Sequence, residues 1–530
     1  MRPTFLGFET QRRTLQIAQK NLDITGNNIS NINTPGYTRQ RVDMYSMYVS
    51  GNRSLRWSSK TNNLSMQGQG VNAYGVSQIR DIFIDKRYRE NVAIESETST
   101  KVQILTDIED VLDNFETDGL QYHTIQFFKA LQDYSGEKPD SADVANVAVN
   151  TAKNLCRLLN AYDTELKQVE TTYVGELTDT VEYVNKILEE MNLLNDKIAK
   201  EKIHFPDEYG PNELYDEMNL YIDELATYGN IEFQRNSSNG TYTVKMANVT
   251  VLDGENFKVN RLLMKDYDIY GVAQVFFESG KDMNLTSGSL KGYIDMINGN
   301  GVYASGGQNS SYGIAYFKSA INEFARTLAD TFNNANGALE DSSRMMFEPD
   351  VEGALITAGN IHVSDSWAED PTMIGQVRYY DEQRGIYRYG FDVMVDDEFT
   401  GEGDETDKDH TSNLTNLQNS NVKYLISQFD NGNLVFGNCH DFQGSLNDYI
   451  SFISNRLGQT IEYEDSRNET AVVTVNGLLD ARDDVSAVQM DEEGINMLNY
   501  QKWYNASSRM VTALDDLLDK LINGTGRVGL

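Results

Sequence analysis

The sequence predicts a multidomain α+β protein in which two terminal helices pair like a coiled coil and enclose a long-helix, α-rich body. A chain of 530 residues exceeds the usual size of one domain, and its seven prolines leave long gaps in which helices can run. The apolar spacing changes from helical to alternating and back twice, which places two β-segments between helices. The chain is therefore expected to run out and back, with outer elements enclosing inner ones.

The amino-terminal segment carries the first helical pattern. From Phe8 to Ile32, apolar residues recur at alternating steps of three and four, interrupted by polar Gln11 and Thr25, which is the spacing of a coiled-coil seam. Thr4 is a candidate N-cap, and Thr34-Pro35-Gly36 is a candidate stop. The residues of this helix expected to pack at an interface are Leu15, Leu22 and Ile29.

The carboxyl-terminal segment repeats this pattern with fewer interruptions. Steps of three and four continue until Asn523-Gly524, a favourable helix stop. Both chain ends are therefore predicted to be long amphipathic helices, whose apolar seams need a covering surface. The seam residues of this second helix are Met497, Tyr500, Tyr504, Ser507, Val511, Leu514, Leu518 and Leu521.

Long helices and a small β-meander are predicted for the body. Helical spacing indicates helices over roughly Ile94 to Leu131 and roughly Asp140 to Ile203, and again over Leu290 to about Asn334. Between them, residues Ile231 to Phe277 alternate with a period of two and contain Asn-Gly and Asp-Gly turns. We expect a meander near residues 230–278.

A second β-segment is predicted farther along the chain. From Phe347 to about Phe436 the sequence is rich in tyrosine, punctuated by glycine and acidic, with alternating stretches typical of strands. Helical spacing resumes at Leu446. The expected organisation is a terminal assembly domain (1–40 and 485–530), a body (41–346 and 437–484) and an inserted outer β-domain (347–436).

Charge argues against several classes of partner. The chain has 45 Lys and Arg against 80 Asp and Glu, so its net charge of -35 repels nucleic acid and anionic membranes. No basic-then-apolar signal segment and no apolar run near the ~18 residues of a membrane span occur, which favours a cytosolic chain or export without a cleaved signal. Cys156 and Cys439 are too few for a disulfide framework.

Catalytic and metal-binding patterns are weak throughout. The five histidines lack metal-ligand spacing, and the adjacent Cys439 and His440 would point to opposite faces of a strand. The acidic stretch Asp396 to Gly401 begins like a calcium loop, but Thr400 and Asp407 replace two ligands that such a loop requires. We therefore expect no enzyme, catalytic residue, cofactor or metal, and we interpret the acidic stretch as a solvated loop.

The strongest local signal is the segment from Asn27 to Gln40. Pro35 fixes its own φ and pushes Thr34 out of the helical region, Gly36 supplies a positive φ for a type II turn, and asparagine tolerates left-handed backbone. The segment resembles the signature of flagellar rod, hook and hook-associated proteins. The residues that carry this motif are Asn27, Asn28, Asn31, Asn33, Thr34, Pro35, Gly36, Tyr37 and Gln40.

Other segments support and narrow this resemblance. The run from Met490 through Arg509 resembles the closing helix of the same family. Thr286 to Tyr293, Leu328 to Asn334 and Ala358 to Ile361 resemble hook-associated members more than hook or rod proteins.

The resemblance implies a secreted structural subunit that leaves the cell unfolded through the flagellar type III apparatus. It would form a ring at the hook-filament junction, with hook protein on one side and a second junction protein or flagellin on the other. An export chaperone would bind the carboxyl-terminal helix. The terminal helices would be disordered in the free protein and helical in the assembly, with interface residues Leu15, Leu22, Ile29, Met497, Tyr504, Val511, Leu514, Leu518 and Leu521.

Three alternatives remain open. The terminal helices could form the core of a stable monomer. The chain could be a hook or rod subunit of the same family. In a different class, the outer β-domain could serve a surface-exposed enzyme or glycan-binding protein, with Tyr379, Tyr380, Tyr387 and Tyr389 as an aromatic face.

Overall fold

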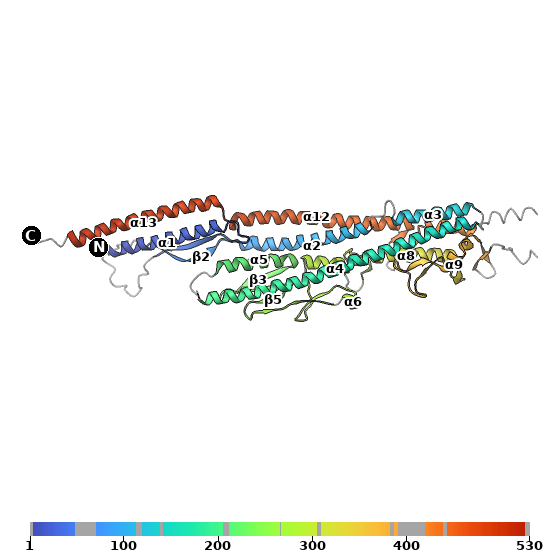
Figure 1. Ribbon diagram of the computed structural model, residues 1–530, viewed down its shortest axis with the longest axis horizontal. Helices are drawn as coiled ribbons and strands as arrows, with labels where there is room; N and C mark the ends of the chain where they lie inside the picture. The colour runs from blue at the N-terminus through green and yellow to red at the C-terminus, as the bar shows by residue number, and fades with distance from the viewer. Residues whose placement is uncertain are drawn as a thin grey trace, which may run out of the picture.

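The computed structural model is an elongated, mostly helical molecule with both chain termini at the same end (Figure 1). It describes residues 4–47, 70–112, 119–137, 141–204, 211–265, 267–304, 309–381, 386–390, 419–437 and 442–524. Elements far apart in sequence lie side by side along its length, so the predicted out-and-back course is observed. Among the described residues, no helix combines the length and apolar character needed to cross a membrane.

The terminal helices α1 (Thr4–Ser30) and α13 (Met490–Gly524) lie against each other in opposite directions (Figure 1). A Cβ added at Gly7 would lie 3.6 Å from the side chain of Leu514, whereas Asn28, at the other end of α1, bonds Glu493 near the start of α13. The predicted pairing of the two ends is confirmed. Thr4 is already helical, so it does not occupy the N-cap position that we expected.

A hairpin that the sequence analysis missed lies along α1. Strand β1 (Gln40–Ser46) pairs antiparallel with β2 (Val71–Gln78), with an irregularity between Asp43 and Met44. The two strands are separated by residues outside the described ranges, so no short turn signal links them in the sequence. The terminal unit is therefore a helix pair supported by a two-stranded sheet.

Long helices build the body. Helix α2 (Ile82–Leu112) packs lengthwise against α12 (Leu446–Ser486), which returns the chain toward the terminal unit (Figure 1). Helix α4 (Ala142–His204) has 63 residues and contacts elements along most of the body. The remaining longer helices here are α3 (Leu120–Gly136), α5 (Asn212–Tyr228), α7 (Ser289–Asn298) and α8 (Ile314–Ala335).

Two of the predicted helices are each divided in the structure. The helix expected over Ile94 to Leu131 is two, because α2 ends at Leu112 and α3 begins after Gly119, whose backbone is extended. The helical region expected from Leu290 is also two, because Gly299 after α7 and Gly313 before α8 are extended. Between them lies the short 3-10 turn Gly301–Tyr303.

The predicted meander is present. Strands β3, β4, β5 and β6 form one antiparallel sheet in chain order, and a separate pair, β7 with β8, follows it, with the one-turn helix α6 between. The bounds are β3 Ile231–Arg235, β4 Tyr242–Met246, β5 Val249–Asp253, β6 Lys258–Val259, β7 Leu262–Met264, α6 Tyr267–Tyr270 and β8 Val275–Phe277.

The segment 347–436 is mixed in its described part. It contains two antiparallel strand pairs and also helix α11, which the alternating pattern did not predict. Helix α11 buries Val422, Leu425 and Phe429 at helical spacing. This segment therefore folds as a helix that packs its apolar face inward, not as a strand. The elements of this end are 3-10 turn Ser342–Arg344, β9 Phe347–Pro349, β10 Ile361–Val363, α9 Asp365–Glu369, 3-10 turn Pro371–Gly375, β11 Val377–Asp381, β12 Ile386–Gly390, α11 Ser420–Phe429, β13 Leu434–Phe436 and β14 Phe442–Gly444.

An aromatic cluster joins this segment to the body. The ring of Phe127 from α3 lies 5.4 Å from Phe332 of α8, 6.1 Å from Phe347 and 5.6 Å from Phe429 of α11. Trp367 of α9, which is fully buried, lies 6.3 Å from the same ring. The described part of 347–436 therefore shares a hydrophobic core with the body helices.

Candidate assembly interface

The terminal helix pair has a small, largely polar core. Among the α1 residues whose burial is described, 7–30, the buried apolar residues are Ile17 and Ala18, beside buried Asn21, Thr25 and Asn28. On α13 the buried residues are Glu493 and Ser507. Such a pair gains little from hydrophobic burial within one chain.

The predicted interface residues lie on α1 and α13, which pack together. Packing within the chain leaves their side chains partly exposed. On α1, Leu15, Leu22 and Ile29 are half-buried. On α13, Tyr504 is 41% exposed and Leu521 54% exposed. The half-buried predicted residues of α13 are Met497, Val511, Leu514 and Leu518.

A second apolar stripe on α13 is exposed. Trp503, Ala506, Met510, Ala513 and Leu517 follow one another at steps of three and four, and all of them are exposed. Their spacing is that of another coiled-coil seam, offset around the helix from the one that faces α1. This stripe was not predicted, although its spacing is visible in the sequence.

An apolar cavity lies next to this exposed stripe. Its volume is about 370 Å³, and Trp503 and Ala506 of α13 form part of its wall. Thr14 of α1 and the hairpin residues Met44 and Val71 complete most of the remainder. The terminal unit thus presents a groove flanked by a row of apolar side chains.

The Asn-rich motif ties the end of α1 to the segment that follows. The side-chain amide of Asn28 donates to the Gln40 carbonyl oxygen at 2.9 Å and to the Glu493 carboxylate at 3.1 Å. Its side-chain oxygen accepts from the Gln40 N–H at 3.0 Å and from the Tyr37 hydroxyl at 2.9 Å. Asn28 is 1% exposed, so these four hydrogen bonds satisfy a buried polar group.

The asparagines of the motif act through their side chains rather than through left-handed backbone. Gly36 has φ of +73°, and the Tyr37 N–H donates to the Thr34 carbonyl oxygen at 3.2 Å, as the predicted turn requires. None of the motif asparagines has a positive φ, so the backbone role expected for them is wrong. Instead, Asn27 donates to the Tyr37 hydroxyl, and Asn31 donates to the Asn27 carbonyl and side-chain oxygens.

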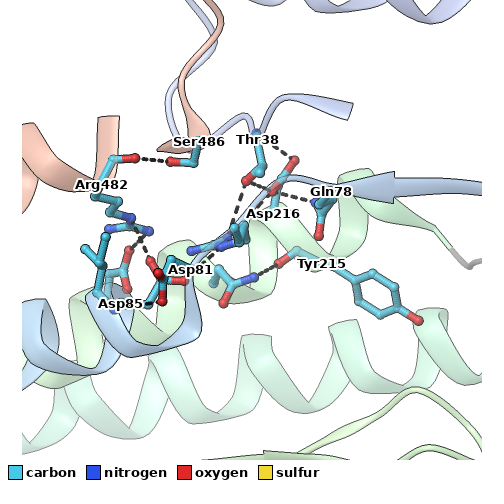
Figure 2. A network of polar contacts seen from close by, with 12 residues as sticks. Thr38, Gln78, Asp81, Asp85, Tyr215, Asp216, Arg482 and Ser486 are labelled. Atoms are coloured by element: carbon cyan, nitrogen blue, oxygen red, sulfur yellow. Dashed lines mark hydrogen bonds and ion pairs between the residues drawn. The ribbon is translucent and has the colours of Figure 1, made fainter. Parts of the chain in front are cut away.

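A polar joint connects the terminal unit to the body (Figure 2). We use this name for Thr38, Arg39, Gln78, Arg80, Asp85, Arg89, Asp216, Asp223 and Arg482. The backbone N–H and hydroxyl of Thr38 donate to the Asp216 carboxylate at 3.1 and 2.6 Å, and Gln78 donates to it at 2.7 Å. Two segments of the terminal unit thereby hold one carboxylate on α5.

Burial shifts the protonation of this carboxylate. Desolvation raises the pKa of Asp216 to about 6, outweighing the Thr38 hydrogen bonds and the nearby Arg80 guanidinium, both of which lower it. The Glu213 carboxylate adds a further raising contribution. Asp216 therefore titrates well above the ordinary range of an aspartate.

Ion pairs complete the joint. Arg482 of α12 contacts Asp85 at 3.0 Å and Asp223 at 2.7 Å, and Arg89 contacts Asp223 at 2.5 Å. Arg39 contacts Glu493 at 2.8 Å, and its N–H donates to the Ser486 carbonyl oxygen at 2.9 Å. Each chain crossing between the terminal unit and the body is therefore anchored by polar contacts.

The residues considered above for catalysis or metal binding form no site within the described part of the chain. Cys156 is a buried free thiol, and burial raises its pKa to about 12. The acidic stretch with Asp407, and also Cys439 and His440, lie outside the described residues, as do the side chains of the four tyrosines. Among the residues the structure does describe, no cluster of His, Cys, Asp or Glu could hold a metal.

Comparisons with known proteins agree with the geometry of the two ends and of the body. A model of the flagellar hook-associated protein FlgK helical domain matches residues 105–340. The flagella basal body rod protein model matches residues 8–38, and the C-terminal model of flagellar basal body rod FlgEFG proteins matches residues 484–524. Flagellar hook-associated protein 1 of Bacillus subtilis is 29% identical over 554 residues, which cover 99% of each chain.

The chain belongs to the flagellar hook-associated protein 1 family.

Membership in the hook-associated protein 1 family rests on nearly the whole chain. The Escherichia coli protein of the same name is 22% identical and covers 96% of this chain and 98% of its own length. The flagellar hook junction protein FlgK from Burkholderia pseudomallei shares the fold, with a TM-score of 0.53 at 12% identity, covering 76% of this chain and 100% of that one. The resemblance read from the sequence is confirmed, and the chain is a structural flagellar protein rather than an enzyme.

Proposed function

We propose that this chain joins the hook to the filament of the bacterial flagellum and assembles into a ring through its terminal helices. Its family supports the location, because both the helical-domain model and the full-length relatives are hook-associated proteins. Hook protein is the expected partner on one side, and a second junction protein or flagellin on the other. Export is expected to proceed through the flagellar type III apparatus, with a chaperone on α13.

The observation that carries the assembly mode is the uncovered apolar surface of α13. One seam of this helix faces α1, whereas the stripe from Trp503 to Leu517 faces solvent. A helix with two seams can pack against α1 of its own chain and against a terminal helix of a neighbour at the same time. Large exposed apolar surfaces of this kind mark interaction sites.

The location is tested by deleting the gene in the source bacterium and examining the cells by electron microscopy. Hooks without filaments, with flagellin lost to the medium, are expected. Absent hooks would instead indicate a rod or hook subunit, and normal filaments would overturn the proposal.

The assembly mode is tested by charged substitutions on α13. Met510→Asp and Leu517→Asp place charges in the exposed stripe and should abolish complementation of the deletion strain, because an unpaired charge at a packed interface is costly. Thr512→Asp is the matched control, since Thr512 is exposed on another face of the same helix. Equal complementation by all three variants would contradict assembly through this stripe.

A further inference from the structure

A cavity of about 320 Å³ opens beside the first turn of α2, at the base of the body. Its lining combines arginines, aromatic rings and polar side chains from five elements: Val76, Ser77, Gln78, Arg80, Ile82, Asp85, Asn212, Asn219, Phe233, Arg235 and Tyr242. None of these residues belongs to the exposed stripe of α13. The surface is therefore separate from the assembly interface proposed above.

Of the two arginines that line the cavity, Arg80 is paired with Asp85 and Asp216, whereas Arg235 has no carboxylate partner among the described residues. Arg235 is exposed, stacks on the Tyr215 ring at 3.7 Å, and forms no ion pair with any described residue. One terminal nitrogen of Arg80 is buried without a hydrogen-bond partner among the described residues. The lining carboxylate, Asp85, already pairs with Arg80 and Arg482. The exposed guanidinium of Arg235 can therefore pair with an acidic side chain of a partner.

Two large apolar side chains are exposed at the start of α2, and the first of them, Ile82, lines the cavity. Ile82 is 71% exposed and Phe83 is 81% exposed. The Asp81 carboxylate accepts a hydrogen bond from the Phe83 N–H at 2.8 Å, which starts α2 at this point and holds both side chains at the surface. Arginine and exposed aromatic residues grouped in this way are typical of the centres of protein interfaces.

The outer face of α12 offers the complementary surface. Its exposed acidic residues make no ion pair with any described residue: Glu462, Asp465, Glu469, Asp480, Asp483 and Asp484. Tyr463 and Val473, which lie among them, are 62% and 72% exposed. Figure 1 shows α12 along one long edge of the body, with α2 between it and α5.

We propose that the cavity, together with the exposed Ile82 and Phe83 at the start of α2, binds the acidic outer face of α12 of a second copy of this chain. The inference rests on the proposed function, since it requires copies to assemble side by side. The two surfaces are different parts of one molecule, so each copy can use both at once and the contact can continue from subunit to subunit. This contact would join the bodies of neighbouring copies, whereas the contact proposed above joins their terminal helices.

Disulfide cross-linking tests the contact directly. Phe83→Cys and Val473→Cys are placed together in the full chain, with Cys156→Ala and Cys439→Ser removing the native thiols. In flagella isolated from cells with normal filaments, mild oxidation should produce a ladder of multimers, and the dilute monomer should give none. The matched control pairs Phe83→Cys with Val147→Cys, which is 51% exposed but lies near the start of α4; it should give no ladder.

The outcomes separate this inference from the proposed function. Normal filaments without a Phe83–Val473 ladder would overturn the inference and leave the junction function standing. A ladder from the Val147 control of equal strength would also overturn it, because the contact would then be non-specific. Failure of the wild-type chain to restore filaments would count against the proposed function instead.

Charge reversal provides an independent test. Arg235→Glu should reduce filament-bearing cells about fivefold, in line with the loss of interfacial charge pairs. Adding Glu469→Lys and Asp480→Lys should recover at least half of the filament-bearing cells that are lost with Arg235→Glu alone. An Arg235→Glu chain that assembles normally, or a loss that the lysines do not restore, would contradict the assignment to α12.

Discussion

The side-chain amide of Asn28 donates a hydrogen bond to the carboxylate of Glu493 at 3.1 Å, which joins positions 465 residues apart in the sequence. The same carboxylate group contacts Arg39 at 2.8 Å. Glu493 is 2% exposed, so its charge is held by the motif segment rather than by water. The two chain ends therefore meet through the asparagine of the family motif.

Replacing Asn28 by alanine should weaken the terminal unit by roughly 2–3 kcal/mol, because it leaves buried groups of Gln40 and Glu493 without their partner. Filaments in the variant should detach at a lower temperature than in the wild type. Ser30→Ala is the control, since the Ser30 hydroxyl is exposed and bonds only its own helix. Equal detachment temperatures for Asn28→Ala and wild type would contradict this role.

Gly36→Ala should impair assembly for two reasons. The backbone φ of +73° disfavours a side chain by about 1 kcal/mol, and a Cβ there would lie 2.5 Å from Leu220. The double variant Gly36→Ala with Leu220→Ala removes the clash but keeps the backbone cost, so it should swim better than the single variant and worse than Leu220→Ala. Motility in soft agar measures the order, and a different ranking would refute the explanation.

The terminal helices should be disordered in the dilute monomer and protected in the assembly, because their shared core is small and polar. Trypsin should cut the monomer rapidly at Arg12, Lys20, Lys502 and Arg509, while the body helices resist. Isolated flagella should be cut slowly at the same sites. Equal protection of both segments in the monomer would favour a stable monomeric helix pair instead.

Asp216 should make stability depend on pH between about 4 and 6. Burial raises its pKa from an ordinary value of 3.8 to about 6, so the folded chain binds the proton more tightly than the unfolded chain. Stability from this group is present below pH 4 and is lost as the pH rises through 6, by at most about 3 kcal/mol. In urea unfolding, Asp216→Asn should therefore gain stability relative to the wild type at pH 7 and little at pH 4.

Asp295 should show the opposite pH dependence of stability in urea unfolding. Burial tends to raise its pKa, but the charges and hydrogen bonds of Lys101 and Lys291 outweigh this, and the pKa is lowered. The stability that the charged Asp295 carboxylate contributes is present above its pKa in the unfolded chain and is lost as the pH falls. Asp295→Asn should hence lose stability at pH 7, and a gain there would contradict the dominance of the two lysines over burial.

Phe332→Ala should destabilise the body and the segment 347–436 together by roughly 3–5 kcal/mol, because its ring lies in the aromatic cluster that they share. Thermal unfolding should shift as one transition rather than two. Leu339→Ala is the control, as Leu339 is 80% exposed and should change little. A separate, unshifted transition would mean that the segment folds on its own core.

Some features were predictable because their causes are local. The 3–4 spacing of Leu514 and Leu518, and the turn chemistry of Pro35 and Gly36, depend on neighbours within a few residues. The meander likewise followed from alternation and Asn-Gly turns. Helix α11 was missed because tyrosine and glycine in the surrounding segment pointed to strands, while its apolar face is only three residues wide.

The sequence by itself determined the terminal helices, the turn at Pro35 and Gly36, the long helix α4 and the family, since periodicity and turn propensities act over short distances. Helix α1 ends at Ser30, four residues before the stop expected from Thr34 onward. Only the tertiary structure decided what those elements contact. Asp216 meets Gln78 across 138 residues and Thr38 across 178. No local pattern encodes such pairings, because they arise when the returning chain brings α5 and α12 beside the terminal unit and buries their charged groups together.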